Sequence, residues 1–209
     1  MNYFDFNSAS EQSNYELIPK GSIVAVRMTI KPGGYDDASQ GWTGGFATRS
    51  ANTGAVYLNC EFVVTCGQFA KRKLWSLIGL YSPKGAEWTN MGRTLIKAIL
   101  NSSRGIHPSD ESPAAQNARR IAGFADLEGI EFIAKVDWER DREGNDKCVI
   151  KSAITPDHKA YAALRSEITR GGTAALPMGS SHPSSAAPAR TYPEAAGRDP
   201  VPGLPSWAQ

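Results

Sequence analysis

The sequence predicts a mostly β protein with a helical insertion and a disordered C-terminal tail. Short segments in the first three quarters of the chain alternate apolar and polar residues with a period of two, as half-buried strands do. A stretch with helical spacing of apolar residues interrupts them. From Gly171 onward, Ala, Pro, Ser and Gly dominate, and such a segment buries too little apolar surface to offset its ordering entropy. We therefore expect a folded domain over residues 1–170 and a tail over residues 171–209.

The first expected strand covers residues 22–31. Its alternation assigns one face to the core, formed by Val24, Val26, Met28 and Ile30. Arg27 and Lys31 then lie on the opposite face. A Gly-rich stretch over residues 35–53 follows, and its segment around residues 42–48 is a candidate for an extra strand.

Two clear strands follow, over residues 55–65 and 70–80, and the short connection between them predicts an antiparallel hairpin. In the first, the core face is expected to hold Val56, Leu58, Cys60, Phe62 and Val64. In the second, the core face is expected to hold Leu74, Ser76, Ile78 and Leu80. Lys73, Trp75 and Leu77 then face away from the core.

Helical spacing predicts a helix over residues 88–100. Ser112 followed by Pro113 predicts the start of a second helix, which would run to Ala122 and stop at Gly123. Strands over residues 130–138 and 147–154 and a short helix over residues 156–170 complete the domain. Three strands, a helical region and two strands is the order of the OB-fold, a five-stranded antiparallel barrel. Another small β-barrel and an α+β sheet are the alternatives.

Charge and composition narrow the classes of function. The formal net charge is +2, so a claim of nucleic-acid binding depends on where the charges lie. No apolar run approaches the roughly 20 residues that span a bilayer, and the N-terminus lacks the basic residues of a signal peptide. The odd number of cysteines, Cys60, Cys66 and Cys148, with two of them in expected strands, indicates reduced thiols in a cytoplasm. Cys60 and Cys66 are too far apart for a CxxC zinc site, so we expect no metal site.

Enzyme signatures are missing from the sequence, including the GxxxxGKS/T, HExxH and GxSxG motifs. We therefore expect a protein that is not an enzyme and needs no cofactor. The carboxylates between Asp137 and Glu143 are of the kind that holds Mg²⁺ in nucleases. Because basic residues alternate with them beside a turn, a solvated hairpin end is the favoured interpretation.

Several motifs lie between Phe4 and Ile154. They are Phe4-Asp5-Phe6-Asn7, Leu17-Ile18-Pro19-Lys20-Gly21, Gly54-Ala55-Val56-Tyr57-Leu58-Asn59-Cys60-Glu61-Phe62, Gly67-Gln68-Phe69-Ala70-Lys71-Arg72-Lys73-Leu74-Trp75 and Asp126-Leu127-Glu128-Gly129-Ile130. These motifs resemble a phage-encoded family long known only as a domain of unknown function, whose genes tend to lie among phage recombination and replication genes. Its members are similar to phage single-stranded DNA-binding proteins with an OB-like core. This chain departs from the pattern in its long Gly-rich insertion and two-part helical region.

The resemblance implies binding of single-stranded DNA in the cytoplasm of a bacterial host, without identifying the contacting residues. Such a binder needs cations along the backbone and aromatic faces on which bases stack. The non-core face of the first three strands offers both, in Arg27, Lys31, Tyr57, Lys73 and Trp75. The start of the third strand adds Lys71 and Arg72. The loop after the first strand, a common site of oligonucleotide binding in OB-folds, adds Trp42, Phe46 and Arg49.

Each of these residues also has an ordinary structural interpretation. Trp75 fits a position packed beneath the helices, and Tyr57 fits a surface cross-strand pair. The basic run Lys71-Arg72-Lys73 fits a solvated edge that discourages aggregation. Trp88 and Trp138 are expected in the core. A phage accessory module that binds a recombinase or host protein and never touches DNA is therefore the main alternative function.

The tail ends in Leu204-Pro205-Ser206-Trp207-Ala208-Gln209. We expect Leu204 and Trp207 to form a docking tip for a phage recombinase or replication protein, because buried Trp is a common anchor in interfaces. Chance placement of this Trp is the alternative. The sequence leaves self-association into a homo-oligomer open.

Overall fold

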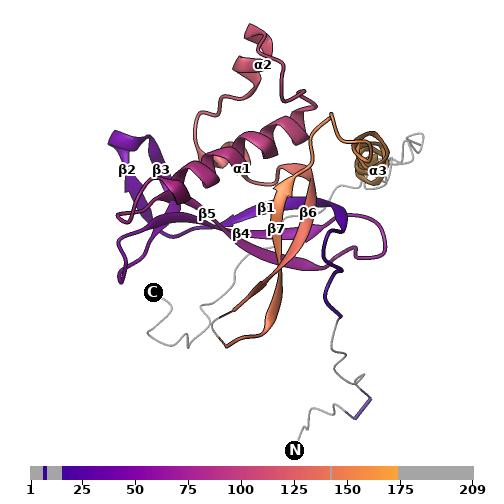
Figure 1. The fold of residues 1–209 in the computed structure, drawn as a ribbon, viewed down its shortest axis with the longest axis horizontal. Helices are drawn as coiled ribbons and strands as arrows, with labels where there is room; N and C mark the ends of the chain where they lie inside the picture. The colour runs from indigo at the N-terminus through magenta and orange to yellow at the C-terminus, as the bar shows by residue number, and fades with distance from the viewer. Residues whose placement is uncertain (1–6, 9–15, 142, 174–209) are drawn as a thin grey trace, which may run out of the picture. The chain divides into compact units, whose positions relative to one another are not determined.

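The computed structural model describes residues 7–8, 16–141 and 143–173 of the 209-residue chain. Its body is a curled antiparallel sheet, a half-barrel, accompanied by three α-helices (Figure 1). The strands and helices, in chain order, are β1 (Ile23–Lys31), β2 (Tyr35–Asp37), β3 (Trp42–Arg49), β4 (Val56–Val64), β5 (Lys73–Tyr81), α1 (Glu87–Arg104), α2 (Pro113–Ala118), β6 (Glu131–Arg140), β7 (Asp146–Ala153) and α3 (Tyr161–Thr173). The predicted mostly β fold with a helical insertion is confirmed. Residues 174–209, with Leu204 and Trp207, lie outside the described residues.

β4 is the centre of the sheet because it pairs with three other strands. β5 pairs along one edge of β4. The other edge is shared, since β3 pairs with residues 56–58 and β1 pairs with residues 59–64. β1 also pairs with β6, and β6 pairs with β7. The described part of the chain thus forms seven strands in one sheet, all antiparallel, where five were predicted with one candidate extra strand.

The two additional strands come from the Gly-rich stretch. The candidate strand at residues 42–48 is confirmed as β3, whereas β2 was not predicted. The chain returns on itself so tightly here that a Cβ atom on Gly33 would lie 2.0 Å from Thr48 Oγ1. Glycine in this stretch therefore allows one backbone segment to lie against another.

The core lies on the face that the alternation predicts. β4 alternates strictly between buried and half-buried residues, with the predicted core residues on the buried side. Phe62 of β4 and Phe132 of β6 meet edge-to-face, with ring centroids 5.9 Å apart. This geometry, favoured by aromatic quadrupoles, joins the two sides of the curled sheet.

The sheet curls far enough to bring β7 beside β5. The backbone N–H of Ile150 donates to Ser76 Oγ at 3.0 Å, so a side chain of β5 supplies the acceptor for this N–H of β7. Ser76 was predicted on the core face, and this bond explains why a polar residue stands there.

α1 packs against β5 through two glycines. A Cβ atom on Gly92 would lie 1.9 Å from the Gly79 carbonyl oxygen, and one on Gly79 would lie 2.5 Å from the Trp88 ring. The helix therefore touches the strand backbone, with Trp88 lying over Gly79. Further along α1, Ile99 and Leu100 are buried in the core.

The other helices differ from their predicted lengths. Ser112 caps α2 as expected, accepting from the Ala115 N–H at 3.2 Å, but the helix ends at Ala118 rather than Ala122. α3 continues to Thr173, three residues past the predicted boundary of the domain. It packs on Ala25 of β1 and Ile133 of β6 through Tyr161 and Ile168, which form a second, smaller core. None of the described helices is both long and apolar enough to cross a bilayer.

Candidate functional site

The face of the sheet opposite the core, here called the outer face, carries cross-strand rows of residues on β1, β4 and β5. Residues directly opposite each other in an antiparallel pair share a face. The register therefore defines three rows: Arg27, Val63 and Lys73; Thr29, Glu61 and Trp75; and Lys31, Asn59 and Leu77. A fourth pair, Tyr57 and Gly79, follows on β4 and β5. Five of the predicted site residues, Arg27, Lys31, Tyr57, Lys73 and Trp75, thus lie on one face.

The two ends of this outer face are covered, and its middle is open. At one end α3 packs on Ala25 and Ile133. At the other end Trp88 of α1 covers Gly79 and approaches Tyr57, with ring centroids 6.2 Å apart. The three rows between these ends keep large exposed side chains, Trp75 at 54% and Leu77 at 52% of their full exposure. Trp75 therefore does not pack beneath the helices, whereas Tyr57 contacts one.

Glu61 organises the middle row. Its Oε1 lies 2.9 Å from Lys73 Nζ, and its Oε2 accepts a hydrogen bond of 3.3 Å from Trp75 Nε1. One carboxylate of β4 thus contacts both Lys73 and Trp75, the cation and the aromatic ring that were predicted as site residues on β5. The indole edge is tied to β4, and the ring remains exposed.

A groove of about 650 Å³ opens beside Trp75. Residues 75–79 of β5 form one side, the first half of α1 closes one end, and the β6–β7 hairpin forms the other side. Its exposed lining includes Trp75, Leu77, Met91, Trp138, Lys147 and Lys151. The groove is therefore partly apolar and aromatic, with lysines along its β7 side.

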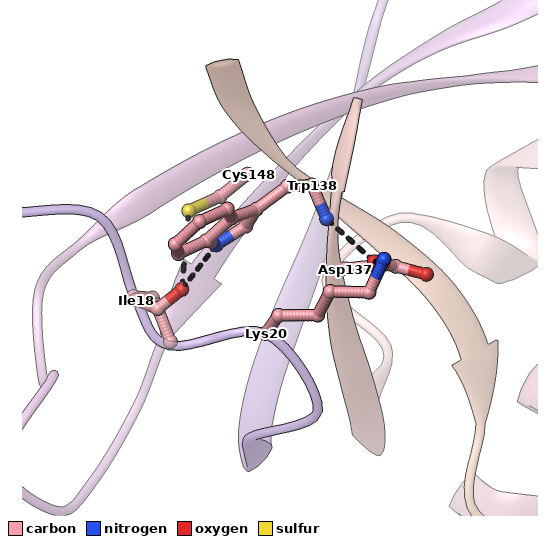
Figure 2. Close-up of polar contacts among 5 residues, drawn as sticks. All are labelled: Ile18, Lys20, Asp137, Trp138 and Cys148. Atoms are coloured by element: carbon pink, nitrogen blue, oxygen red, sulfur yellow. Dashed lines mark hydrogen bonds and ion pairs between the residues drawn. The ribbon is translucent and has the colours of Figure 1, made fainter. Parts of the chain in front are cut away.

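The N-terminal segment before β1 holds the β6–β7 hairpin in place (Figure 2). The Ile18 carbonyl accepts a hydrogen bond of 2.7 Å from Trp138 Nε1, and Cys148 Sγ lies 3.7 Å from the same oxygen. Lys20 Nζ pairs with Asp137 Oδ1 at 2.9 Å. Trp138 was expected in the core, and that expectation is wrong, because it is 39% exposed and is held at the hairpin by its indole N–H.

Carboxylates neutralise most cations near the groove. Arg27 pairs with Glu131 at 2.6 Å, Lys73 with Glu61 at 2.9 Å, and Lys147 with Glu139 at 3.6 Å. Lys151, which is exposed, has no ion-pair partner within the described ranges. The local charge is therefore nearly balanced, as the composition is.

The remaining predicted residues lie away from the open rows. Arg72 donates to the Glu16 carbonyl and lies over the Phe69 ring, while Lys71 is exposed in the same turn. Arg49 lies over Tyr35, 5.6 Å from its ring centroid. Trp42 and Phe46 are half-buried and pack against the main core. Their aromatic faces are therefore less available than that of Trp75.

The sequence analysis missed Met91, Lys147 and Lys151 as lining residues. The sequence contained a signal for the two lysines, because Lys147, Val149 and Lys151 are two residues apart on the last strand and therefore share one face of it. Met91 gave none, because its helical spacing is typical of a core residue, yet it is 63% exposed.

The chemistry of the cysteines does not favour nucleophilic catalysis. Burial raises the pKa of Cys60 to about 12. Burial also raises the pKa of Cys66, with Glu167 adding to the effect, and raises the pKa of Cys148. All three are therefore thiols at neutral pH, whereas nucleophilic cysteines need a lowered pKa. Within the described residues, no three His, Cys, Asp or Glu side chains gather as metal ligands.

Comparisons of this chain with protein-family models, with curated proteins and with solved structures found no match. The family resemblance and the function that it implies therefore stay predictions. The outer face and the groove are the observations that bear on function.

Proposed function

We propose that the described domain is an OB-like barrel that binds single-stranded DNA without chemical catalysis, in the cytoplasm of a phage-infected bacterium. The strand order supports the fold: β1, β4 and β5 correspond to the first three strands of the barrel and β6 and β7 to the last two. α1 connects the third of these strands to the fourth, and the Ile150–Ser76 hydrogen bond brings the fifth beside the third. In OB-folds the outer surface of the second and third strands binds oligonucleotides, which here is the surface of β4 and β5.

The exposure of Trp75 carries the proposal. Trp75 is 54% exposed and lines one groove together with exposed Leu77 and Met91, and an exposed apolar patch of this kind marks an interaction site. Stacking of a base on the face of the Trp75 ring fits such a site, and the adjoining groove leaves room for the strand. Lys147 and Lys151 then lie where phosphates would run along β7. Stacking is tolerant of sequence because every base has a π-face.

Binding of labelled oligo-dT and of a matched duplex, measured by fluorescence anisotropy over a series of salt concentrations, tests the proposal. We expect preference for the single strand and an affinity that falls with salt. Equal affinity for both forms, or no binding to either at low salt, would overturn it.

The near-balanced charge of the groove supports a second candidate, a phage accessory module that binds a protein instead of DNA. With Lys73, Arg27 and Lys147 already paired, exposed Leu77 and Met91 present a surface that an apolar peptide fits. The absence of DNA binding in the anisotropy experiment, together with capture of the phage recombinase by the purified protein, would favour this function.

The C-terminal tail is the segment expected to recruit a partner protein. We propose that Leu204 and Trp207 dock to the phage recombinase or replication protein. Deleting residues 174–209 should then leave oligo-dT affinity nearly unchanged and abolish partner capture, and Trp207→Ala should cause most of the same loss. A truncated protein that captures the same partner would assign recruitment to the folded domain.

A further inference from the structure

Glu61 holds two groups of the proposed site at once, and it does so from the strand that lies beside them. It stands directly opposite Trp75 in the β4–β5 register and diagonally from Lys73. Its Oε1 pairs with Lys73, and its Oε2 accepts a hydrogen bond from the Trp75 indole N–H. A carboxylate so placed presents a negative charge in the middle of the outer face, where a nucleic acid would bring phosphates.

Glu61 competes with any phosphate for Lys73, because the two side chains are already paired at 2.9 Å. The side chains of Lys73 and Glu61 are 54% and 30% exposed, so water screens their attraction. Before Lys73 neutralises a phosphate it must leave Glu61, and the freed carboxylate then repels the same phosphate. A lysine that stays paired with a protein carboxylate neutralises no phosphate, so it releases none of the cations condensed on the nucleic acid and adds little to the salt dependence of binding.

We infer that Glu61 is the residue that limits affinity at this site: it holds Lys73 out of contact with phosphates and leaves Trp75 as the main contact of β5. This inference rests on the proposed binding of single-stranded DNA. It explains why a strand carries a cation and an aromatic ring beside a carboxylate that partly cancels the cation. It also implies that β5 binds the strand mainly by stacking of bases on Trp75, and that Lys73 contributes only when Glu61 is neutralised.

The test is a double-mutant cycle in full-length protein, with oligo-dT as the probe. Glu61→Gln keeps the shape of the side chain and an acceptor for the Trp75 indole, and removes the charge. We expect it to bind about two- to fivefold more tightly than the wild type, the range that an exposed ion pair supports. The slope of log affinity against log salt should steepen by about 0.7, the value for one added phosphate contact on a single strand.

Two further comparisons make the result specific. In a Lys73→Ala background, Glu61→Gln should leave the slope unchanged, because no lysine is present at residue 73 to contact a phosphate. Glu111→Gln, an equal change of net charge at an exposed residue outside the groove, should also leave the slope unchanged. Circular dichroism of each variant establishes that it is folded.

The outcomes separate the inference from the proposed function. If the wild type binds oligo-dT and Glu61→Gln binds no more tightly, or if the steeper slope persists without Lys73, the inference is overturned and the function stands. If Glu61→Gln binds and the wild type does not, the carboxylate blocks the site, which supports the inference about Glu61 and overturns the proposed function of the wild type. If neither protein binds at low salt, both the function and the inference are overturned.

Discussion

The two halves of β5 show the same alternation and meet different neighbours. In the first half, Lys73, Trp75 and Leu77 point away from the core and stay exposed. In the second half, Gly79 takes the next outward position and lies beneath Trp88 and Gly92 of α1. The groove therefore begins where the helix stops covering the strand. The two facing glycines decide that place, because only without side chains can the helix approach the strand backbone so closely.

The covered half is the easiest to break. Gly92→Ala places a methyl group 1.9 Å from the Gly79 carbonyl oxygen, and a backbone atom cannot move aside as a side chain can. We expect a loss of about 3 kcal/mol in the free energy of unfolding, as overpacking produces at rigid sites. In a helix without this contact, replacing glycine by alanine stabilises the protein by about 1 kcal/mol. A decrease in the free energy of unfolding of Gly92→Ala would therefore indicate the close approach of α1 to β5. Urea unfolding measures it.

Gly123→Ala is the matched control for that substitution. A Cβ atom there meets nothing within 4 Å, and the backbone is extended, so we expect little change. A Gly92→Ala protein as stable as the wild type would show that α1 shifts freely, and the contrast between the halves of β5 would then lose its cause.

The open half is tested by Trp75→Ala. Loss of stacking should weaken oligo-dT binding by about 1–3 kcal/mol. The exposed position should keep the free energy of unfolding within about 0.5 kcal/mol of the wild type. Anisotropy and urea unfolding measure the two quantities. Tyr81→Ala is the control, because Tyr81 is exposed on the same strand and does not line the groove. Equal effects of the two substitutions on binding would remove Trp75 from the site.

The opposite side of the groove depends on the N-terminal segment. Trp138→Phe keeps an aromatic ring and removes the N–H that donates to the Ile18 carbonyl at 2.7 Å. We expect a cost of about 1 kcal/mol in the free energy of unfolding, the usual value of one hydrogen bond. Amide hydrogen exchange should also become faster in β7. Unchanged stability and exchange would mean that the hairpin keeps its place without this bond.

The smallest effect concerns pH. Pairing with Lys20 and the hydrogen bond from the Trp138 N–H hold the pKa of Asp137 below its ordinary value. A lowered pKa contributes stability above the ordinary carboxyl pKa of about 3.9, and this contribution is lost as pH falls through the lowered value. The Lys20→Met protein should therefore be slightly less stable than the wild type at pH 7 and equal to it in strong acid. Thermal unfolding at several pH values measures this, and a difference that persists in acid would assign the effect to packing of the lysine stem.

The alternation along the strands was sufficient to predict the core face and the residues opposite it. It placed Phe62 and Leu74 inside and Trp75 outside, because in a regular strand successive side chains point to opposite faces whatever the partner strand is. It failed at Trp138, whose position depends on a hydrogen bond to a carbonyl 120 residues away in the sequence. It also missed β2, because a strand of three residues is too short to show a two-residue period.

The pattern of residues alone predicts which face of each strand is apolar, where the helical insertion lies and that Trp75 stands outward on β5. These are local properties, set by the two-residue period of a strand and the 3.6-residue period of a helix. Only the tertiary structure decided which outward residues remain open. Tyr57 and Trp75 both face outward, yet α1 reaches only Tyr57, because Gly79 and Gly92 bring the helix down at that end. It also decided that Lys73 is paired with Glu61, since that contact depends on the register between two strands, which no periodicity within one strand specifies.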